Sequence, residues 1–220
     1  METTVGALKG QVASRFERLG LPTWPDPHSG PARPREEEYS RVTDPGRYGI
    51  VHARARLWAE VLEAALGAKS VPLAPDGRPF ARGVRITPPT AGALPLLLLE
   101  RDAPTGPGEA PLAVLEIAVA RPEVVIETQP DCGCDACDSG SGQLIEAIDS
   151  TIGQVVGGPF VVLRGKKWSA RWHPDGSGAS SQGRAPEFAT VMDWCRRLAE
   201  GEAVRLPRGT EAFVGGSWLG

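Results

Sequence analysis

The sequence lacks the short motifs by which many enzymes are recognised. It contains no Gly-x-Ser-x-Gly nucleophile motif and no zinc-protease motif, and its three histidines, His28, His52 and His173, are far apart in the chain. The Gly- and Ser-rich stretch 174–186 lacks the Gly-Lys-Ser/Thr ending of a phosphate-binding loop, so we interpret it as a flexible linker. The sequence therefore predicts no catalytic residue, and we expect a binding or accessory protein.

Long apolar runs and an excess of charge of one sign are also absent. No run approaches the roughly 18 to 20 apolar residues of a membrane-spanning helix, and the first residues lack the three regions of a secretory signal. With 24 basic and 27 acidic side chains the formal net charge is -3, which gives no general attraction to nucleic acid or to an acidic membrane. We expect a cytoplasmic protein without nucleic-acid or membrane partners. Its four cysteines should stay reduced there unless a metal holds them.

The chain of 220 residues is long enough for one domain with a sizeable core, and its 27 glycines and 21 prolines predict many turns. Near its start, apolar residues recur every three or four positions, which is typical of an amphipathic helix. These residues are Val5, Leu8, Val12, Phe16 and Leu19. Prolines crowd residues 22–34 and predict a linker. We expect residues 1–38 to form an extension, whose helix docks on the domain or on a protein partner, and residues 39–220 to form the domain.

The first half of this domain combines one helix with several strands. Asp44 followed by Pro45 predicts the start of the helix, because Asp44 can accept the free backbone N–H groups of the first turn, and Gly67 predicts its end. Short apolar runs bounded by Pro and Gly follow, and their length favours strands. These runs are residues 84–87, 94–99, 112–119 and 123–128. The tight connection at Arg121-Pro122 makes the last two runs antiparallel neighbours.

The second half repeats this mixture of elements. Residues 141–156 have helical periodicity, residues 160–163 and 168–172 predict a hairpin, and a last helix is expected over residues 186–200. That helix should bury Phe188, Val191, Cys195 and Leu198. Alternation in the hairpin places its tryptophans on a core face, which explains the basic and aromatic stretch 164–173 more simply than a nucleic-acid surface does. The expected fold is α+β, a single domain with mainly an antiparallel sheet packed against two or three helices and a cysteine-rich loop before a helix.

Three of the four cysteines lie within six residues, between the predicted sheet and the next predicted helix. Cys132, Cys134 and Cys137 are spaced so that a turn can bring their thiolates together as three ligands of a tetrahedral zinc ion. The fourth ligand is open: Cys195, His173 or one of the aspartates Asp131, Asp135 and Asp138. We predict a metal site with Cys132, Cys134, Cys137 and Cys195 as candidate ligands. The place of Cys195 on the apolar face of the last helix is also that of an ordinary buried cysteine.

Two other interpretations of the loop stay open at this point. Cys134 and Cys137 form a Cys-x-x-Cys pair, as in a thiol redox enzyme, but the neighbouring aspartates raise the thiol pKa and oppose formation of the reactive thiolate. The start of the following helix acts in the opposite direction with only a partial charge. In the third interpretation no metal binds, and Asp138, Ser139 or Ser141 caps the helix within an acidic turn.

Three segments carry a resemblance to a known family. They are residues 39–45 (YSRVTDP), 130–138 (PDCGCDACD) and 214–219 (VGGSWL), and the cysteine motif is the most specific of them. Together they resemble an uncharacterised family of actinobacterial proteins, domain of unknown function 6226, over about residues 39–220. The resemblance implies an origin in the bacterial cytoplasm. It implies no mechanism, since the family has no established activity, and it leaves residues 1–38 as an extension.

Overall fold

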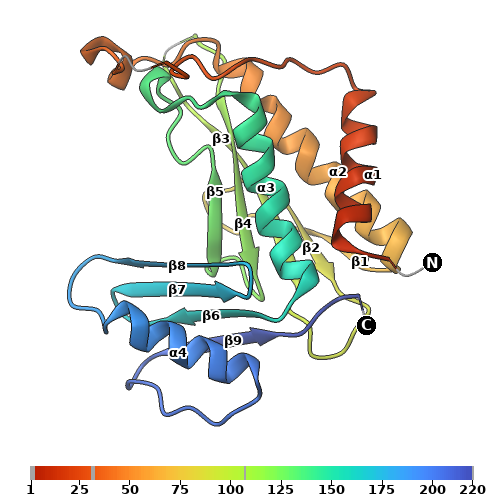
Figure 1. Ribbon diagram of the computed structural model, residues 1–220. Helices are drawn as coiled ribbons and strands as arrows, with labels where there is room; N and C mark the ends of the chain where they lie inside the picture. The colour runs from red at the N-terminus through yellow and green to blue at the C-terminus, as the bar shows by residue number, and fades with distance from the viewer. Residues whose placement is uncertain (1–2, 31–32, 107, 220) are drawn as a thin grey trace.

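The larger part of the fold is built on a five-stranded antiparallel sheet. The computed structural model describes residues 3–30, 33–106 and 108–219, and Figure 1 shows their arrangement. The sheet has the order β1-β2-β3-β4-β5, so each strand pairs with its neighbour in sequence. Its strands are β1 (Lys69–Leu73), β2 (Arg82–Thr87), β3 (Leu96–Ala103), β4 (Leu112–Val119) and β5 (Val125–Gln129). The predicted antiparallel pairing of the last two strands is confirmed.

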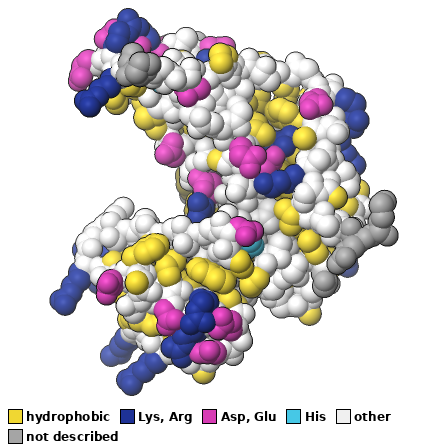
Figure 2. Space-filling model, viewed as in Figure 1, with side chains coloured by type: hydrophobic (Ala, Val, Ile, Leu, Met, Phe, Trp, Pro, Cys, Tyr) yellow, Lys and Arg dark blue, Asp and Glu magenta, His cyan; other side chains and the backbone are white. Residues whose placement is uncertain are grey.

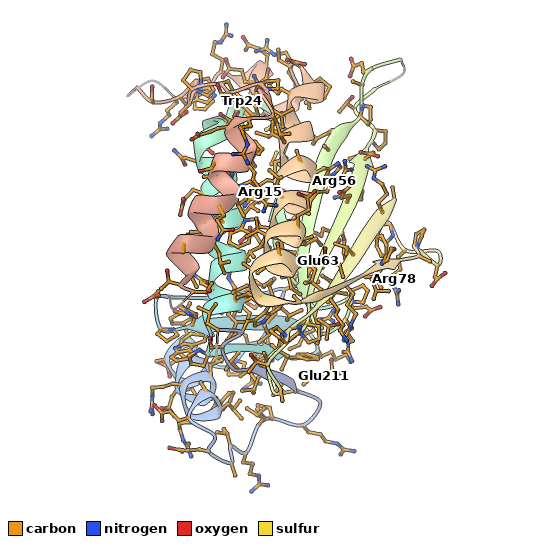
Figure 3. All side chains as sticks on the ribbon, turned by 90° about the vertical axis from the view of Figure 1, so that its right-hand side faces the viewer. Arg15, Trp24, Arg56, Glu63, Arg78 and Glu211 are labelled. Atoms are coloured by element: carbon orange, nitrogen blue, oxygen red, sulfur yellow. The ribbon has the colours of Figure 1, made fainter. Side chains whose placement is uncertain are left out.

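Three helices lie on one side of this sheet, two of them against its strands and the first in the chain packed on those two, as Figure 3 shows from the side. They are α1 (Val5–Glu17), α2 (Ile50–Leu66) and α3 (Gly140–Gly157). Alternation along β3 separates two clusters, because Leu96 and Leu98 belong to the main core while Leu97 and Leu99 pack with Phe80. Within the described ranges, no helix is both long and apolar enough to cross a membrane. The expected α+β fold is confirmed.

The predicted N-terminal amphipathic helix is also confirmed, and its apolar side is buried in the main core. Leu8 and Val12 on α1 are fully buried. Gly153 on α3 allows α1 to approach closely, because a Cβ atom at this position would lie 3.0 Å from Cγ1 of Val5. The apolar side of α1 therefore packs on the protein's own helices, whereas Leu19, beyond the end of the helix, is 50% exposed.

The remaining strands form a separate four-stranded antiparallel sheet of order β8-β7-β6-β9. They are β6 (Phe160–Arg164), β7 (Trp168–His173), β8 (Gly176–Ser181) and β9 (Glu211–Gly215). The last helix, α4 (Phe188–Ala199), buries Val191 and Cys195 against this sheet, and the two tryptophans of β7 pack against the same cluster, as predicted. Figure 2 shows a broad hollow between the parts of the molecule that carry the two sheets.

Several local predictions are wrong. Asp44 has a left-handed backbone with φ of 49° and makes no cap; a 3₁₀ helix (Pro45–Gly49) follows it, and α2 begins only at Ile50. The side chain of Phe188 is not buried but 53% exposed. The predicted flexible linker contains β8, which pairs with β7 along its whole length. The sequence of β8 consists of Gly, Ser and Ala, so it has no alternation of large apolar and polar residues that would predict a strand. Its pairing with β7 depends on backbone hydrogen bonds.

A buried ion pair joins α2 to α3. Arg54 donates two hydrogen bonds to the carboxylate of Asp149, one of them from Nε at 2.9 Å, and Nε1 of Trp58 donates to the same carboxylate at 2.7 Å. The guanidinium of Arg54 also lies 5.1 Å from the centre of the Phe16 ring at the end of α1. Since Arg54 and Asp149 are both buried, each depends on the other for compensation of its charge.

Candidate metal centre

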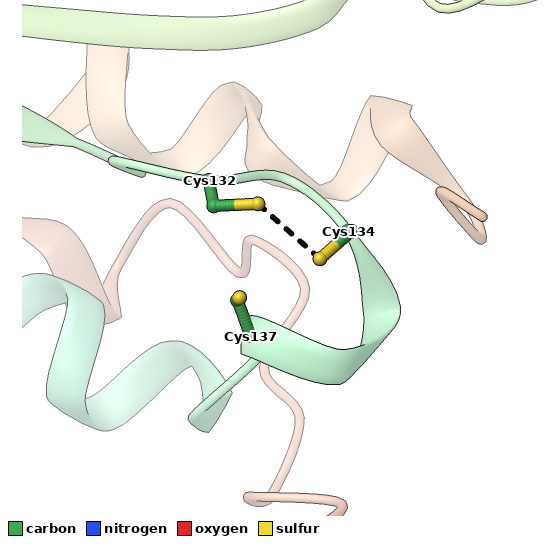
Figure 4. A group of neighbouring side chains, drawn as sticks. All are labelled: Cys132, Cys134 and Cys137. Carbon is green, nitrogen blue, oxygen red and sulfur yellow. Dashed lines mark hydrogen bonds between the residues drawn. The ribbon is translucent and has the colours of Figure 1, made fainter. Parts of the chain in front are cut away.

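The cysteine loop, residues 130–139, connects the end of β5 to the start of α3. Its three cysteine sulfur atoms lie within 4.8 Å of one another and point toward a common centre (Figure 4). The Sγ atoms of Cys132 and Cys134 are 3.2 Å apart. Cys134 is buried, whereas Cys132 and Cys137 are exposed. The predicted convergence of these three residues is confirmed, and their sulfur atoms are close enough to hold one metal ion.

The backbone of the loop explains this convergence. Gly133 lies against β4, where a Cβ atom would lie 2.2 Å from Cδ2 of Leu112, so a larger residue between the first two cysteines would displace the Leu112 side chain. A short 3₁₀ helix, η3 (Asp135–Cys137), then turns the chain back, and the N–H of Cys137 donates to the carbonyl oxygen of Cys134 at 3.0 Å. The close approach to β4 and the tight turn together bring the third sulfur beside the first two.

Asp135 attaches the loop to residues 41–43. Its carboxylate accepts hydrogen bonds from Nε of Arg41 at 2.6 Å and from the N–H and hydroxyl of Thr43, both at 2.7 Å. Its own N–H donates to the carbonyl oxygen of Arg41 at 2.8 Å. Burial raises the pKa of Asp135, but the hydrogen bonds from Arg41 and Thr43 outweigh this effect and lower it overall. Asp135 is thus an ionised anchor whose carboxylate is already occupied.

Asp138 attaches the loop to two further places. Its carboxylate accepts hydrogen bonds from Nε1 of Trp24 at 2.9 Å and from Nη2 of Arg47 at 2.5 Å. It also accepts the N–H of Gly140 at 2.9 Å, which confirms that Asp138 serves the start of α3, whereas Ser139 makes no capping bond. The three converging thiols and the two anchoring carboxylates therefore belong to the same short loop but have separate partners.

The structure does not bring Cys195 or His173 to the three sulfur atoms. Cys195 lies on α4 and is fully buried against Val161, Leu163 and Ala170 of the smaller sheet, and burial raises its pKa to about 12. Nδ1 of His173 instead accepts the N–H of Asp175 at 3.1 Å. Among the described residues, the group that could hold a metal ion consists of Cys132, Cys134 and Cys137.

The neighbouring thiols shift one another's acidity in opposite directions. Burial raises the pKa of Cys134, but hydrogen bonds involving Cys132 and Cys137 outweigh it, so that the pKa of Cys134 falls below its usual value. The pKa of Cys137 rises to about 12, chiefly because of its hydrogen bonds with Cys134 and Cys132. The lowered pKa of Cys134 and the raised pKa of Cys137 thus have the same physical cause, the hydrogen bonds within the group.

A pocket of about 330 Å³ lies on the carboxylate side of the cysteine loop and was not predicted. Its walls come from three parts of the chain: residues 24–28, residues 38–47 and the two anchoring aspartates. Nε2 of His28 lies 3.0 Å from the carbonyl oxygen of Asp135, and the guanidinium of Arg47 lies 4.6 Å from the centre of the Trp24 ring. Figure 3 shows Trp24 beyond one end of the helical layer. No sequence signal reveals this pocket, since the two aspartates lie about a hundred residues along the chain from the other walls.

These features define an α+β protein with two antiparallel sheets and a three-thiol loop between a strand and a helix. The chain belongs to a family of unknown function (DUF6226), whose family model matches residues 12–219. This match begins earlier than residue 39, where the resemblance of the motifs began. Two of those motifs meet in the fold, through the bonds of Asp135 to Arg41 and Thr43. No curated protein and no solved structure matches the chain.

Proposed function

We propose that the protein is a non-catalytic binding or accessory protein whose cysteine loop binds a structural zinc ion through Cys132, Cys134 and Cys137. The observation that carries the proposal is the gathering of three sulfur atoms within 4.8 Å. Zinc bonds of about 2.3 Å in a tetrahedron place sulfur ligands about 3.8 Å apart, so the group has the size of a site for a single ion. Thiolates are also preferred ligands of zinc.

The role proposed for the ion is to hold together the parts of the chain that meet at the loop. Fixing the three cysteines also fixes Asp135 and Asp138, which lie among them and immediately after them. Through their hydrogen bonds, these aspartates hold Trp24, Arg41 and Thr43, which line the pocket. Zinc would therefore stabilise the walls of the pocket, which is the candidate binding surface. The cytoplasm of an actinobacterium stays the expected location, since a reducing compartment keeps free thiols available for a metal.

A melting experiment with matched variants tests this role. Zinc at a hundred times its dissociation constant should stabilise the native protein by about 2.7 kcal/mol, which raises the melting temperature by about 5 to 10 °C relative to protein treated with a chelator. Cys134→Ser should lose this increment. Cys195→Ala should keep it, even if its metal-free protein melts at a different temperature. The same melting temperature for the wild-type protein with zinc and with chelator would contradict the proposal.

Thiol redox chemistry at Cys134 and Cys137 is the alternative function. Two observations favour it: the sulfur atoms are close together, and the pKa of Cys134 is lowered. It predicts that one thiol of the metal-free native protein reacts rapidly with iodoacetamide at neutral pH and that Cys134→Ser removes this reaction. Slow alkylation of all four thiols would exclude it. The metal-free interpretation, with Asp138 as a helix cap, predicts that the protein does not bind zinc and that no thiol reacts rapidly with iodoacetamide.

A protein partner at the N-terminal helix stays a separate proposal. The residues that define the apolar side of α1, Leu8 and Val12, are buried, so a partner would contact the outer side of the helix or the exposed Leu19. Leu19→Ser changes this exposed position without touching the core. A partner at this site predicts that the variant loses an association that the wild-type protein shows in sedimentation experiments, and an unchanged association would place the partner elsewhere.

A further inference from the structure

The cysteine group has three ligands, and its coordination is therefore incomplete. Among the described residues, no other His, Cys, Asp or Glu joins the three sulfur atoms. Structural zinc sites are almost always closed by four protein ligands, whereas three protein ligands leave one position of the tetrahedron to a group from outside. The carboxylates of the two anchoring aspartates already have other partners. Asp135 is held by Arg41 and Thr43. Asp138 is held by Trp24 and Arg47.

The exposure of the sulfur ligands indicates where this position lies. Cys134 is buried, while Cys132 and Cys137 are exposed at the surface of the loop. An ion bound by all three would therefore have protein on the side of Cys134 and solvent on the side of the other two. A ligand could reach the fourth position from solvent without any opening of the fold.

We propose that the fourth position binds a neutral nitrogen donor, an imidazole group, supplied from outside the chain. This inference rests on the proposed metal site. Zinc with three thiolates carries one net negative charge, and the exposed carboxylate of Asp131 adjoins Cys132. The nearby guanidinium groups of Arg41 and Arg47 are already paired with Asp135 and Asp138. A thiolate or carboxylate in the fourth position would raise the net negative charge of the group from one to two beside Asp131, whereas a neutral imidazole would leave it unchanged. Three cysteines and one histidine are an established set of zinc ligands.

The imidazole is expected from another molecule rather than from a second copy of this chain. The sequence has three histidines. His52 and His173 are buried, and His28 lies in the pocket with Nε2 against the carbonyl oxygen of Asp135. The donor is therefore free histidine, a related small molecule, or a histidine side chain on a different protein.

The experiment uses the full chain loaded with Co²⁺ in place of zinc, because the visible spectrum of Co²⁺ reports the number and type of its ligands. Imidazole, acetate and 2-mercaptoethanol are titrated separately at constant pH and ionic strength. The proposal predicts a saturable spectral change with one imidazole per cobalt, no change with acetate, and weaker binding of the thiol. Cys195→Ala, which alters the cysteine outside the group, should give the same imidazole curve as the wild-type protein.

A spectrum of bound cobalt that imidazole leaves unchanged would overturn the inference, because it would mean that the fourth position is closed. Tighter binding of the thiol than of imidazole would also overturn it. Asp131→Asn tests the charge argument and should improve thiol binding several-fold relative to imidazole binding. Failure to bind cobalt or zinc at all would instead refute the metal site itself.

Two peptides distinguish the sources of the donor. One contains a single central histidine, and the other has alanine in its place. Tighter binding of the histidine peptide than of free imidazole, with no binding of the alanine peptide, assigns the position to a protein partner. Equal or weaker binding of the histidine peptide assigns it to a small molecule. Both results support an imidazole donor, and each identifies a different class of partner.

Discussion

Replacing Asp138 with alanine should destabilise the fold, because this one carboxylate joins three parts of the chain. The change removes the acceptor for Nε1 of Trp24, the acceptor for Nη2 of Arg47 and the cap on the N–H of Gly140. Loss of a helix cap costs about 1 kcal/mol, and removal of one partner of a buried ion pair costs about 3 to 5 kcal/mol. The side chain of Arg47 retains 19% of its exposure, so water can compensate part of its charge. We therefore expect a loss of about 3 kcal/mol in the free energy of unfolding.

Urea denaturation followed by tryptophan fluorescence measures this loss. The matched control is Asp131→Ala, which removes an exposed carboxylate from the same loop. This carboxylate accepts the N–H of the adjacent Cys132, and its loss should change stability by less than about 0.5 kcal/mol. Adding Arg47→Met to Asp138→Ala should restore part of the loss, because the unpaired charge is then removed. A loss below about 1 kcal/mol for Asp138→Ala, or no recovery in the double variant, would refute the anchoring role derived from these contacts.

Three other changes test separate parts of the structure. Asp149→Ala should cost about 3 to 5 kcal/mol and Arg54→Met should recover part of this loss, whereas a double variant no better than the single one would contradict an unpaired charge as the cause. Burial lowers the pKa of His173, so below about pH 6.5 the unfolded chain takes up a proton that the folded protein resists, and stability falls. His173→Gln should flatten this fall between pH 7 and 5 in urea titrations, and equal slopes would refute the assignment. Gly133→Ala should weaken zinc binding by about tenfold because its Cβ atom would displace the Leu112 side chain and shift the loop, while Gly142→Ala, which has open space, should bind zinc normally in a competition titration; equal affinities would contradict the close approach as a cause of convergence.

The elements that the sequence predicts best are those whose burial follows a regular period. β4 coincides with the predicted residues 112–119, because both of its faces are covered and its residues are therefore apolar and buried except for Glu116. The period of α1 is equally clear, since Leu8 and Val12 face the core. β8 has no such signal, because its small side chains bury little surface and its position depends on backbone pairing with β7. Asp44 shows a different limit, since an N-cap residue type followed by proline also fits the start of a 3₁₀ helix.

The candidate site could be predicted only as far as its parts are close in sequence. Cys132, Cys134 and Cys137 are near enough for their spacing to predict convergence. No local pattern relates Cys195 to them, because its position depends on the packing of α4 on the smaller sheet, which places that cysteine in a different core. The contact of Trp24 with Asp138 likewise depends on how the whole chain folds, and no local pattern encodes it.

The most direct test of the central claim is the metal content of protein purified without a chelator or a metal-affinity tag, measured together with the number of thiols that react before and after denaturation. The account predicts about one zinc per chain and protection of the three loop thiols and the buried Cys195 until the protein unfolds. Protein that contains no zinc, takes up none from solution and exposes reactive loop thiols in its native state would contradict the proposed metal centre.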